Sequence, residues 1–350
     1  MKKRTTIALL IGIMVFTTLL AGCRSGTDPA ETGGDPTELN SKEFFAMDTY
    51  MEIRGYGASE ELLDEASKAV TDLEKLISTT YDGSEIAQIN AAGSGTVTGE
   101  AEELLLESLF LCDELQGTLD ISIYPVVKAW GFTTGEHRIP ADSEIDALLE
   151  KVDYQKVLLN DDGTVELGEG MQIDLGAVAK GYTGDMLAEL FTDAGITSAL
   201  FSLGGNVQCL GSKLGGSPWN VGIQDPESEG ILGTVPVINK AVVTSGGYER
   251  YFEGPDGEIY WHIMDPATGR PAKNGLISAT IVGDSGIRCD ALSTALFIMG
   301  PEKAADFWRS HKDFEMILVT EDHKILVSEG IAEDFTPESG LDYTVETINY

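Results

Sequence analysis

Residues 260–271 read YWHIMDPATGRP and hold one of the four histidines of the chain, His262. An apolar run leads into this histidine, and a turn built on Asp-Pro and Thr-Gly follows it, because such pairs punctuate the backbone. We therefore expect a strand at 260–264 that ends at the turn. His262 and Met264 would share one face of it, since side chains two residues apart on a strand point the same way. A histidine at a strand end beside a loop suits a functional site, and it equally suits a surface hairpin with a half-buried histidine.

On both sides of this strand the chain alternates between helix and strand patterns. Apolar residues at a helical period predict helices at 60–76, 101–115, 143–152, 176–194 and from 290 to 299, with Ser143 as the N-cap of the third. Strands are expected at 44–53, 156–159, 164–167, 198–203, 219–223, 241–244, 314–320 and 324–328. Turn residues inside 156–167 and 314–328 predict two hairpins. The fold class that follows is α+β, a mixed α/β domain with a largely antiparallel sheet.

The start of the chain has the composition of an export signal. A basic segment at residues 2–4 precedes an apolar run at 7–20, which is short for a membrane-spanning helix. The run ends in Leu-Ala-Gly-Cys, which predicts a lipoprotein signal peptide at residues 1–22 and Cys23 as the lipidated N-terminus. An ordinary signal or an uncleaved anchor is the alternative. We expect an exported protein, lipid-anchored to the cell membrane on its extracytoplasmic face.

Three further segments complete the predicted domain organisation. Residues 23–40 are rich in Gly, Pro, Thr and acids, which predicts a flexible acidic tether. Residues 41–333 have a globular composition with no fixed-period repeat, which fits one large domain or two intimate subdomains. Residues 334–350 are predicted to form a polar C-terminal tail.

The charge and the cysteines exclude several classes of protein. The formal net charge is −35, and loss of the signal peptide, with its three cations and no acid, makes it more negative. Such a surface repels nucleic acid, so no nucleic-acid partner is expected. Cys112, Cys209 and Cys289 have no metal-ligand spacing and apolar neighbours, which predicts buried free thiols.

The stretch IDLGAVAKGY at 173–182 places Asp174 and Lys180 around a run of small residues. An aspartate at the start of the helix expected at 176–194 is explained by capping and by the helix dipole. The small residues that follow favour a different interpretation, in which a ligand approaches the backbone closely. Both interpretations stay open on these residues alone.

Asp290 and Thr294 stand four residues apart and therefore share a face of the expected helix. A carboxylate and a hydroxyl on one helix edge can offer oxygens to a hard divalent cation. Two such ligands are too few, so backbone carbonyls or substrate phosphates would have to complete the shell. An N-cap aspartate beside an ordinary threonine is the alternative.

Ten segments, taken in this order, resemble one known family, the ApbE-like FAD:protein FMN transferases, or flavin transferases. They are MDT at 47–49, DGSEI at 82–86, TLDI at 118–121, WGF at 130–132, IDLGAVAKGY at 173–182, LGGN at 203–206, WNVGIQDP at 219–226, TSG at 244–246, HIMDPATGRP at 262–271 and DALSTA at 290–295. The resemblance covers nearly all of residues 44–328. It implies a single ApbE-like, T-fold-related domain behind the lipoprotein signal peptide.

The activity that the resemblance implies is Mg²⁺-dependent transfer of FMN from FAD to a threonine hydroxyl of a target protein, with AMP released. His262 would be the catalytic base. The implied FAD contacts are Met47, Tyr81, Leu119, Asp120, Ile121, Asp174, Lys180 and Met264. The implied ligands of Mg²⁺ are the carbonyl of Ala177 with Asp290, Ser293 and Thr294. Asp48, where the family commonly has glycine, and Asn206, where an acid is frequent, depart from the pattern.

The partners implied by the resemblance are FAD, as substrate, and flavin-accepting subunits of membrane redox complexes of the Rnf or Nqr type. Two other functions fit the same residues. One is an Mg²⁺-dependent FAD pyrophosphatase, in which water replaces the threonine. The other is a lipid-anchored FAD-binding protein without turnover.

Overall fold

The structure is a computed structural model that describes residues 35–350. The predicted signal peptide, Cys23 and most of the predicted tether lie outside the described residues. Within residues 35–350, no helix is long and apolar enough to cross a membrane.

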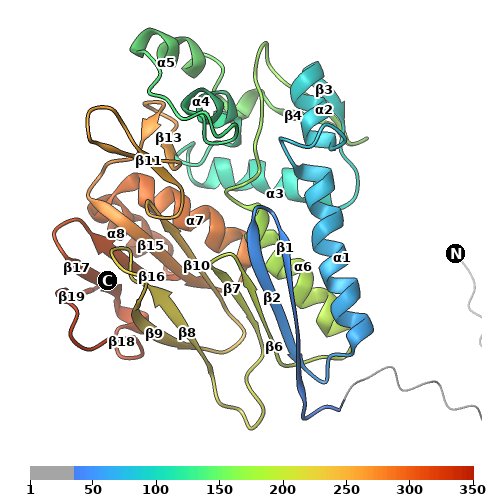
Figure 1. Cartoon of the computed structure of the whole chain (residues 1–350), viewed down its shortest axis with the longest axis vertical. Coiled ribbons are helices and arrows are strands. Elements are labelled where there is room, and N and C mark those ends of the chain that lie inside the picture. Colours follow the sequence, from blue (N-terminus) through green and yellow to red (C-terminus); the bar gives the residue numbers. More distant parts are fainter. Residues whose placement is uncertain (1–34) are drawn as a thin grey trace, which may run out of the picture. The chain divides into compact units, whose positions relative to one another are not determined.

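A nine-stranded sheet forms the centre of the described part (Figure 1). Its strands, in spatial order, are β1 (Leu39–Ala46), β2 (Thr49–Tyr56), β6 (Ala199–Leu203), β7 (Asn206–Leu210), β10 (Ala241–Gly246), β15 (Leu276–Gly283), β16 (Glu315–Thr320), β17 (Lys324–Ser328) and β19 (Thr344–Ile348). Every neighbouring pair is antiparallel except β17 and β19. The prediction of an α+β fold with a largely antiparallel sheet is confirmed. Residues 334–350, predicted as a polar tail, contribute β19 and the short β18 (Thr336–Pro337).

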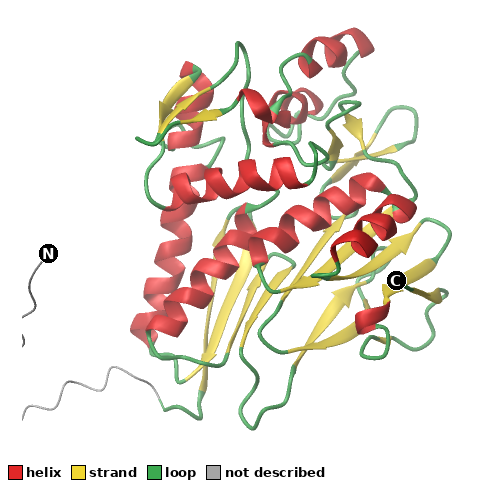
Figure 2. Ribbon diagram, turned by 180° about the vertical axis from the view of Figure 1, so that it is seen from behind, coloured by secondary structure: helices red, strands yellow, loops and turns green. Residues whose placement is uncertain are grey.

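Helices cover one face of this sheet, and a smaller sheet packs on part of the other (Figure 2). The helices that pack on its strands are α1 (Glu60–Ile77), α6 (Ala179–Asp193), α7 (Gly286–Met299) and α8 (Pro301–His311). The other helices are α2 (Glu85–Ala92), α3 (Glu100–Glu114), α4 (Tyr124–Trp130) and α5 (Asp142–Leu149), with 3-10 turns η1 (Ile121–Ile123), η2 (Tyr154–Lys156) and η3 (Glu329–Ile331). The smaller sheet joins β18, β9 (Ile231–Val237) and β8 (Trp219–Gln224). Apolar side chains of β8 and β9 meet those of β10, β15, β16 and β17 in a separate cluster.

Three more small sheets complete the described strands. They pair β3 (Ser94–Thr96), β5 (Thr164–Glu166) and β4 (Leu158–Leu159); β11 (Tyr251–Glu253) and β12 (Ile259–Trp261); and β13 (Met264–Asp265) and β14 (Arg270–Pro271). Both predicted hairpins, β4–β5 and β16–β17, are confirmed. The three cysteines of the described part are buried and free, as predicted.

The single strand predicted at 44–53 is wrong, because the segment is the hairpin β1–β2. The chain reverses at Met47 and Asp48, whose φ angles are 50° and 59°. Both residues therefore adopt the left-handed region, which is uncommon for residues other than glycine but in which aspartate is enriched. Apolar and aromatic residues stand on both sides of the turn, and no glycine or proline marks it, so the composition gave no sign of the reversal.

The strand predicted at 260–264 is also wrong, because it is two short strands, β12 and β13, with a break at His262 and Ile263. His262 lies in a bend, so it does not share a strand face with Met264. The backbone N–H of His262 donates to the carbonyl of Arg250 at 3.0 Å, just outside the pairing of β11 with β12. The turn at 265–269 that we expected after this segment is present.

Three predicted helix starts are wrong in ways that matter for the site. Helix α5 begins after Ala141, and Ser143 does not cap it. Helix α6 begins at Ala179, three residues later than predicted, so Asp174 does not cap it. Helix α7 begins at Gly286 with Ser285 as its N-cap, which rules out the alternative that Asp290 is an N-cap.

Helices α6 and α7 cross at two glycines. A Cβ atom added to Gly181 would lie 2.2 Å from the carbonyl oxygen of Gly286, closer than side chains ever approach. Asp290 of α7 accepts the N–H of Gly181 at 2.8 Å, and Asp185 of α6 accepts that of Gly286 at 2.7 Å. Both N–H groups belong to first turns, where no partner exists within the helix. Each helix therefore caps the other.

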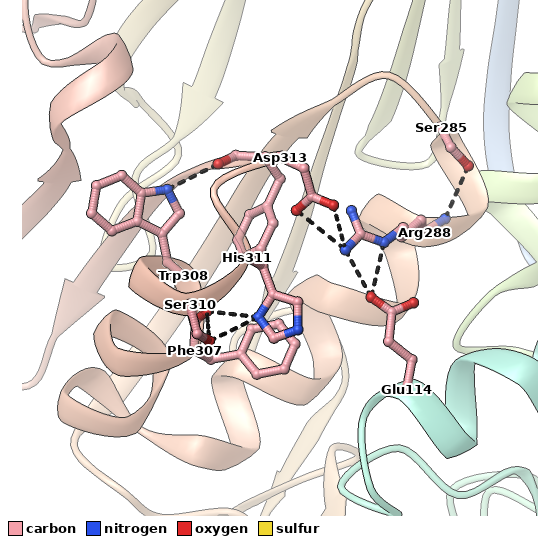
Figure 3. A network of polar contacts seen from close by, with 9 residues as sticks. Glu114, Ser285, Arg288, Phe307, Trp308, Ser310, His311 and Asp313 are labelled. Carbon is pink, nitrogen blue, oxygen red and sulfur yellow. Dashed lines mark hydrogen bonds and ion pairs between the residues drawn. The ribbon is translucent and has the colours of Figure 1, made fainter. Parts of the chain in front are cut away.

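The first turn of α7 is also tied to neighbouring elements, as Figure 3 shows. Arg288 donates to Glu114 at the end of α3 at 2.7 Å and pairs with Asp313 after α8 at 3.0 Å. Arg288 lies two residues before Asp290, so these contacts hold the helix that carries three of the four predicted metal ligands.

The glycine crossing predicts that Gly181→Ala destabilises the protein. The methyl group would meet a backbone carbonyl and the helices would have to separate, which costs about 1–3 kcal/mol of unfolding free energy. Urea unfolding measures this. Gly222→Ala in β8 is the matched control, because its added carbon would have an ordinary 3.4 Å contact with Ile231. Equal midpoints for the two variants would contradict the close approach.

Candidate functional site

A cavity of about 940 Å³ lies where the β1–β2 turn, the loop before α6 and the bend before β13 meet α7. Its volume is within the usual range for a site that holds a cofactor-sized ligand. It brings together most of the residues predicted from the sequence. They are Met47, Leu119, Asp120, Ile121, Asp174, Ala177, Lys180, His262, Met264, Asp290 and Thr294.

Two predicted site residues do not line the cavity. Tyr81 is 54% exposed and its ring lies over Gly83, while Ser78, Thr79 and Thr80 of the same loop reach the cavity wall. Ser293 is fully buried, and its hydroxyl donates to the carbonyl of Asp290 at 2.8 Å.

One ring nitrogen of His262 is in a hydrogen bond, and the other is available to accept a proton. Its Nδ1 lies 3.2 Å from the carbonyl oxygen of Arg250. Because a carbonyl only accepts, Nδ1 carries the proton in this contact and Nε2 keeps its lone pair. Burial lowers the pKa of His262 from 6.5 to about 4, with a further contribution from the positive charges of Arg250 and Lys180. The imidazole is therefore neutral at pH 7 and able to accept a proton.

Arg250 lines the cavity and was not predicted from the sequence as a site residue. Its carbonyl receives both the backbone and the ring N–H of His262. Its guanidinium donates to the carbonyl of Phe132 at 2.9 Å and lies close enough to Asp174 to favour that carboxylate. Only the folded chain shows these contacts, because Arg250 is separated from Phe132 by 118 positions.

Asp290 is a buried carboxylate. One of its oxygens accepts a hydrogen bond, and nearby positive charge compensates its negative charge only in part. Oδ2 accepts the N–H of Gly181. Burial raises the pKa of Asp290, while Lys180 and hydrogen bonds act against that rise. Asn206 lies beside Asp290 and helps to lower the pKa of that carboxyl, and its buried amide oxygen has no hydrogen-bond partner within the described residues. A buried polar atom without a partner beside a carboxylate could bind a cation, or a water molecule on that cation.

The other oxygens around Asp290 are hydroxyls and a carbonyl. Ser245 of β10, which the sequence analysis did not assign, lies 2.8 Å from the hydroxyl of Ser293 and 3.2 Å from that of Thr294. Ala177 lines the cavity, and its carbonyl receives no hydrogen bond from a described residue. No group of three His, Cys, Asp or Glu side chains within residues 35–350 can hold a metal. The donors present are hard oxygens, which fit Mg²⁺.

Two of the predicted flavin contacts have clear structural tasks. Asp120 accepts the N–H and the hydroxyl of Ser122 at 2.8 and 2.6 Å, and the N–H of Tyr154 at 3.1 Å. Asp174 accepts the N–H of Gly176 at 2.6 Å and so shapes the loop before α6. Burial raises the pKa of both carboxyls. Both residues therefore set the shape of the cavity wall.

The cavity wall is acidic. It carries six carboxylates, Asp48, Glu74, Asp120, Asp174, Glu249 and Asp290, against two permanent cations, Lys180 and Arg250. Burial raises the pKa of Glu249, and the nearby charge of Asp290 raises it further, whereas Lys180 lowers it. A ligand with a pyrophosphate group would meet net repulsion here unless a cation accompanied it.

Residues 47–318 of the chain match the model of the ApbE family. The FAD:protein FMN transferase of Treponema pallidum is 34% identical over 291 residues, which cover 77% of this chain and 80% of the relative. The FAD:protein FMN transferase of Klebsiella pneumoniae is 32% identical over 301 residues, covering 81% and 90%.

Solved structures have the same fold. The ApbE protein of Thermotoga maritima superimposes with a TM-score of 0.79 at 29% identity, covering 85% of this chain and 99% of that one. The flavinyl transferase ApbE of Pseudomonas stutzeri, in its apo form, gives a TM-score of 0.73 at 26% identity, covering 81% and 92%.

The surroundings of His262 predict that its imidazole stays neutral down to about pH 5, whereas an unperturbed imidazole is half protonated near pH 6.5. NMR titration of the ring, assigned with the His262→Gln variant, measures this. A midpoint at or above 6.5 would contradict the burial and the effect of the two neighbouring cations.

Proposed function

This chain belongs to the ApbE family, and from that premise we propose that it transfers FMN from FAD to a threonine hydroxyl of a target protein and releases AMP. The observation that carries the proposal is the geometry of His262. Its Nδ1 is held by a backbone carbonyl, and its ring stands in the wall of the cavity that also contains Lys180, Asp290 and Thr294.

The chemical step needs no redox change. The hydroxyl of the acceptor gives its proton to Nε2 of His262, and its oxygen forms a bond to the phosphorus on the FMN side of the pyrophosphate. The bond between that phosphorus and the AMP oxygen breaks, so the products are a phosphoester of FMN on the acceptor and AMP. A hydroxyl is a poor nucleophile until a base removes its proton, which is why a neutral imidazole suits the task.

The residues present fit a magnesium ion. Asp290, Thr294 and the carbonyl of Ala177 would hold it, and Ser293 would support Thr294 through the hydroxyl of Ser245. When bound, Mg²⁺ neutralises phosphate charge and stabilises the charge that develops toward the leaving group. Lys180 contributes a second positive charge from the first turn of α6.

The proposed setting follows from parts of the chain that lie outside the described residues. Lipidation at Cys23 would anchor the enzyme to the extracytoplasmic face of the cell membrane. The proposed acceptors are flavin-carrying subunits of membrane redox complexes of the Rnf or Nqr type, to which such an anchor would give access in two dimensions.

The transfer is tested by incubating the protein with FAD, Mg²⁺ and the soluble domain of an Rnf- or Nqr-type flavin-carrying subunit, followed by mass spectrometry. We expect the mass of FMN added to the domain and none added to its Thr→Val variant. His262→Ala should slow the transfer by about 10²–10⁴-fold, the usual contribution of a general base. Equal release of FMN and AMP with and without the domain would favour a pyrophosphatase, and no release would favour a binding protein.

Asp290→Asn tests the metal ligand more sharply than alanine does, because the asparagine carbonyl still accepts the N–H of Gly181. We expect Mg²⁺-dependent turnover to fall by at least about 10²-fold while FAD binding, read from flavin fluorescence, is partly retained. Asp225→Asn is the control, since this aspartate is also buried but bonds Ser228 and Tyr343 outside the cavity. Full turnover in Asp290→Asn would refute the assignment.

A further inference from the structure

The cavity of about 940 Å³ described above is called the flavin cavity from here on. We propose that a second, smaller cavity beside it receives the hydroxyl-bearing segment of the acceptor protein. The inference rests on the proposed transfer reaction and assigns a place to its second substrate. The smaller cavity has a volume of about 540 Å³. It is lined by Phe132, Thr133, Thr134, Gly135, His137, Glu249, Arg250 and Tyr251.

The two cavities meet at the catalytic base. Phe132, Thr133, Glu249 and Arg250 line both of them. The carbonyl of Arg250 holds the ring of His262, and the ring of Phe132 meets the imidazole edge-on at 6.3 Å. A group that enters the smaller cavity therefore reaches Phe132 and Arg250, the two residues that contact the ring of His262.

None of the residues predicted to contact FAD or the metal lines the smaller cavity. The flavin cavity contains those residues and would be occupied by the nucleotide. In a displacement at phosphorus, the attacking oxygen approaches opposite the leaving group, so the acceptor must enter on another side than AMP. The smaller cavity supplies such an entrance, at the side where the base stands.

The wall formed by residues 131–137 is held in place before any partner binds. Gly131 has a φ of 88°, and a Cβ atom added there would lie 2.2 Å from the carbonyl oxygen of Glu136. The N–H of Gly135 donates to the carbonyl of Gly131 at 2.9 Å, and Arg250 donates to that of Phe132. The ring of His137 stacks on Phe252 at 4.9 Å. A preformed wall lowers the entropic cost of binding a protein segment.

The chemistry of the wall suits a polypeptide segment. Thr134 and His137 offer hydrogen-bonding groups to peptide N–H and carbonyl groups, while Phe132 and Tyr251 offer ring surfaces. Tyr251 is 53% exposed, at the rim. An exposed aromatic residue with a polar end is the type that interfaces prefer as an anchor.

Thr134→Trp tests the proposal by placing an indole in the smaller cavity. Thr134 is an exposed loop residue, and Thr192→Trp, at an exposed position of α6, is the matched control. We expect Thr134→Trp to lower transfer to the acceptor domain by at least about tenfold, equivalent to about 1.4 kcal/mol, mainly through a higher KM for that domain. Its affinity for FAD in the presence of Mg²⁺, read from flavin fluorescence, should match wild type, because Thr134 does not line the flavin cavity.

A photo-crosslinking residue at position 134, and the same residue at 192, gives a positive readout. We expect a crosslink to the acceptor domain from 134 and none from 192. If Thr134→Trp transfers FMN at the wild-type rate, or loses its affinity for FAD, the inference is wrong. The proposed transferase function would not be affected by either result. If the wild-type protein attaches no FMN to the domain, the proposed function fails and the inference fails with it.

Discussion

The close crossing of α6 and α7 is the contact on which the site depends. With only hydrogen atoms at Gly181 and Gly286, the two backbones approach closely, and Asp290 and Asp185 each cap the opposite helix. The crossing places Lys180, next to Gly181, beside the carboxylate of α7. Asp290 therefore stabilises the packing of the two helices through one oxygen, and its second oxygen is left for a ligand. The packing of α6 on α7 thus also positions the site.

Electrostatics explains why the cavity combines acids with a neutral histidine. A flavin nucleotide with its pyrophosphate would be repelled by the acidic wall, and the divalent cation that we propose would remove this repulsion by binding both the wall and the phosphates. The low pKa of His262 follows from burial and from Arg250 and Lys180. The positive charges of Arg250 and Lys180, which would attract the phosphates of FAD, thus also keep His262 unprotonated. One arrangement of charges would therefore serve both FAD and the acceptor hydroxyl.

Much of the fold and of the site could be predicted from local patterns. The spacing of Asp290 and Thr294, the small residues before Lys180 and the turn after His262 each report a local geometry. Asp290, Thr294, Lys180, His262, most of the small residues and Pro266 of the turn line the cavity. The reversal at Met47 and Asp48 could not be predicted, because the turn contains no glycine or proline and is flanked on both sides by residues that favour strands. The N-caps of α6 and α7 were misplaced for a similar reason, since helical periodicity does not mark where a helix begins.

The sequence by itself determined the family, the α+β class and the residues of the cavity wall, because periodicity, turn residues and motif order are local properties of a chain. Only the tertiary structure decided how those residues act. Gly181 and Asp290 are 109 positions apart, and Arg250 meets Phe132 across 118. The state of His262, the role of Ser245 and the second cavity all depend on such distant contacts, because hydrogen-bond partners and burial arise from packing, which no local pattern specifies.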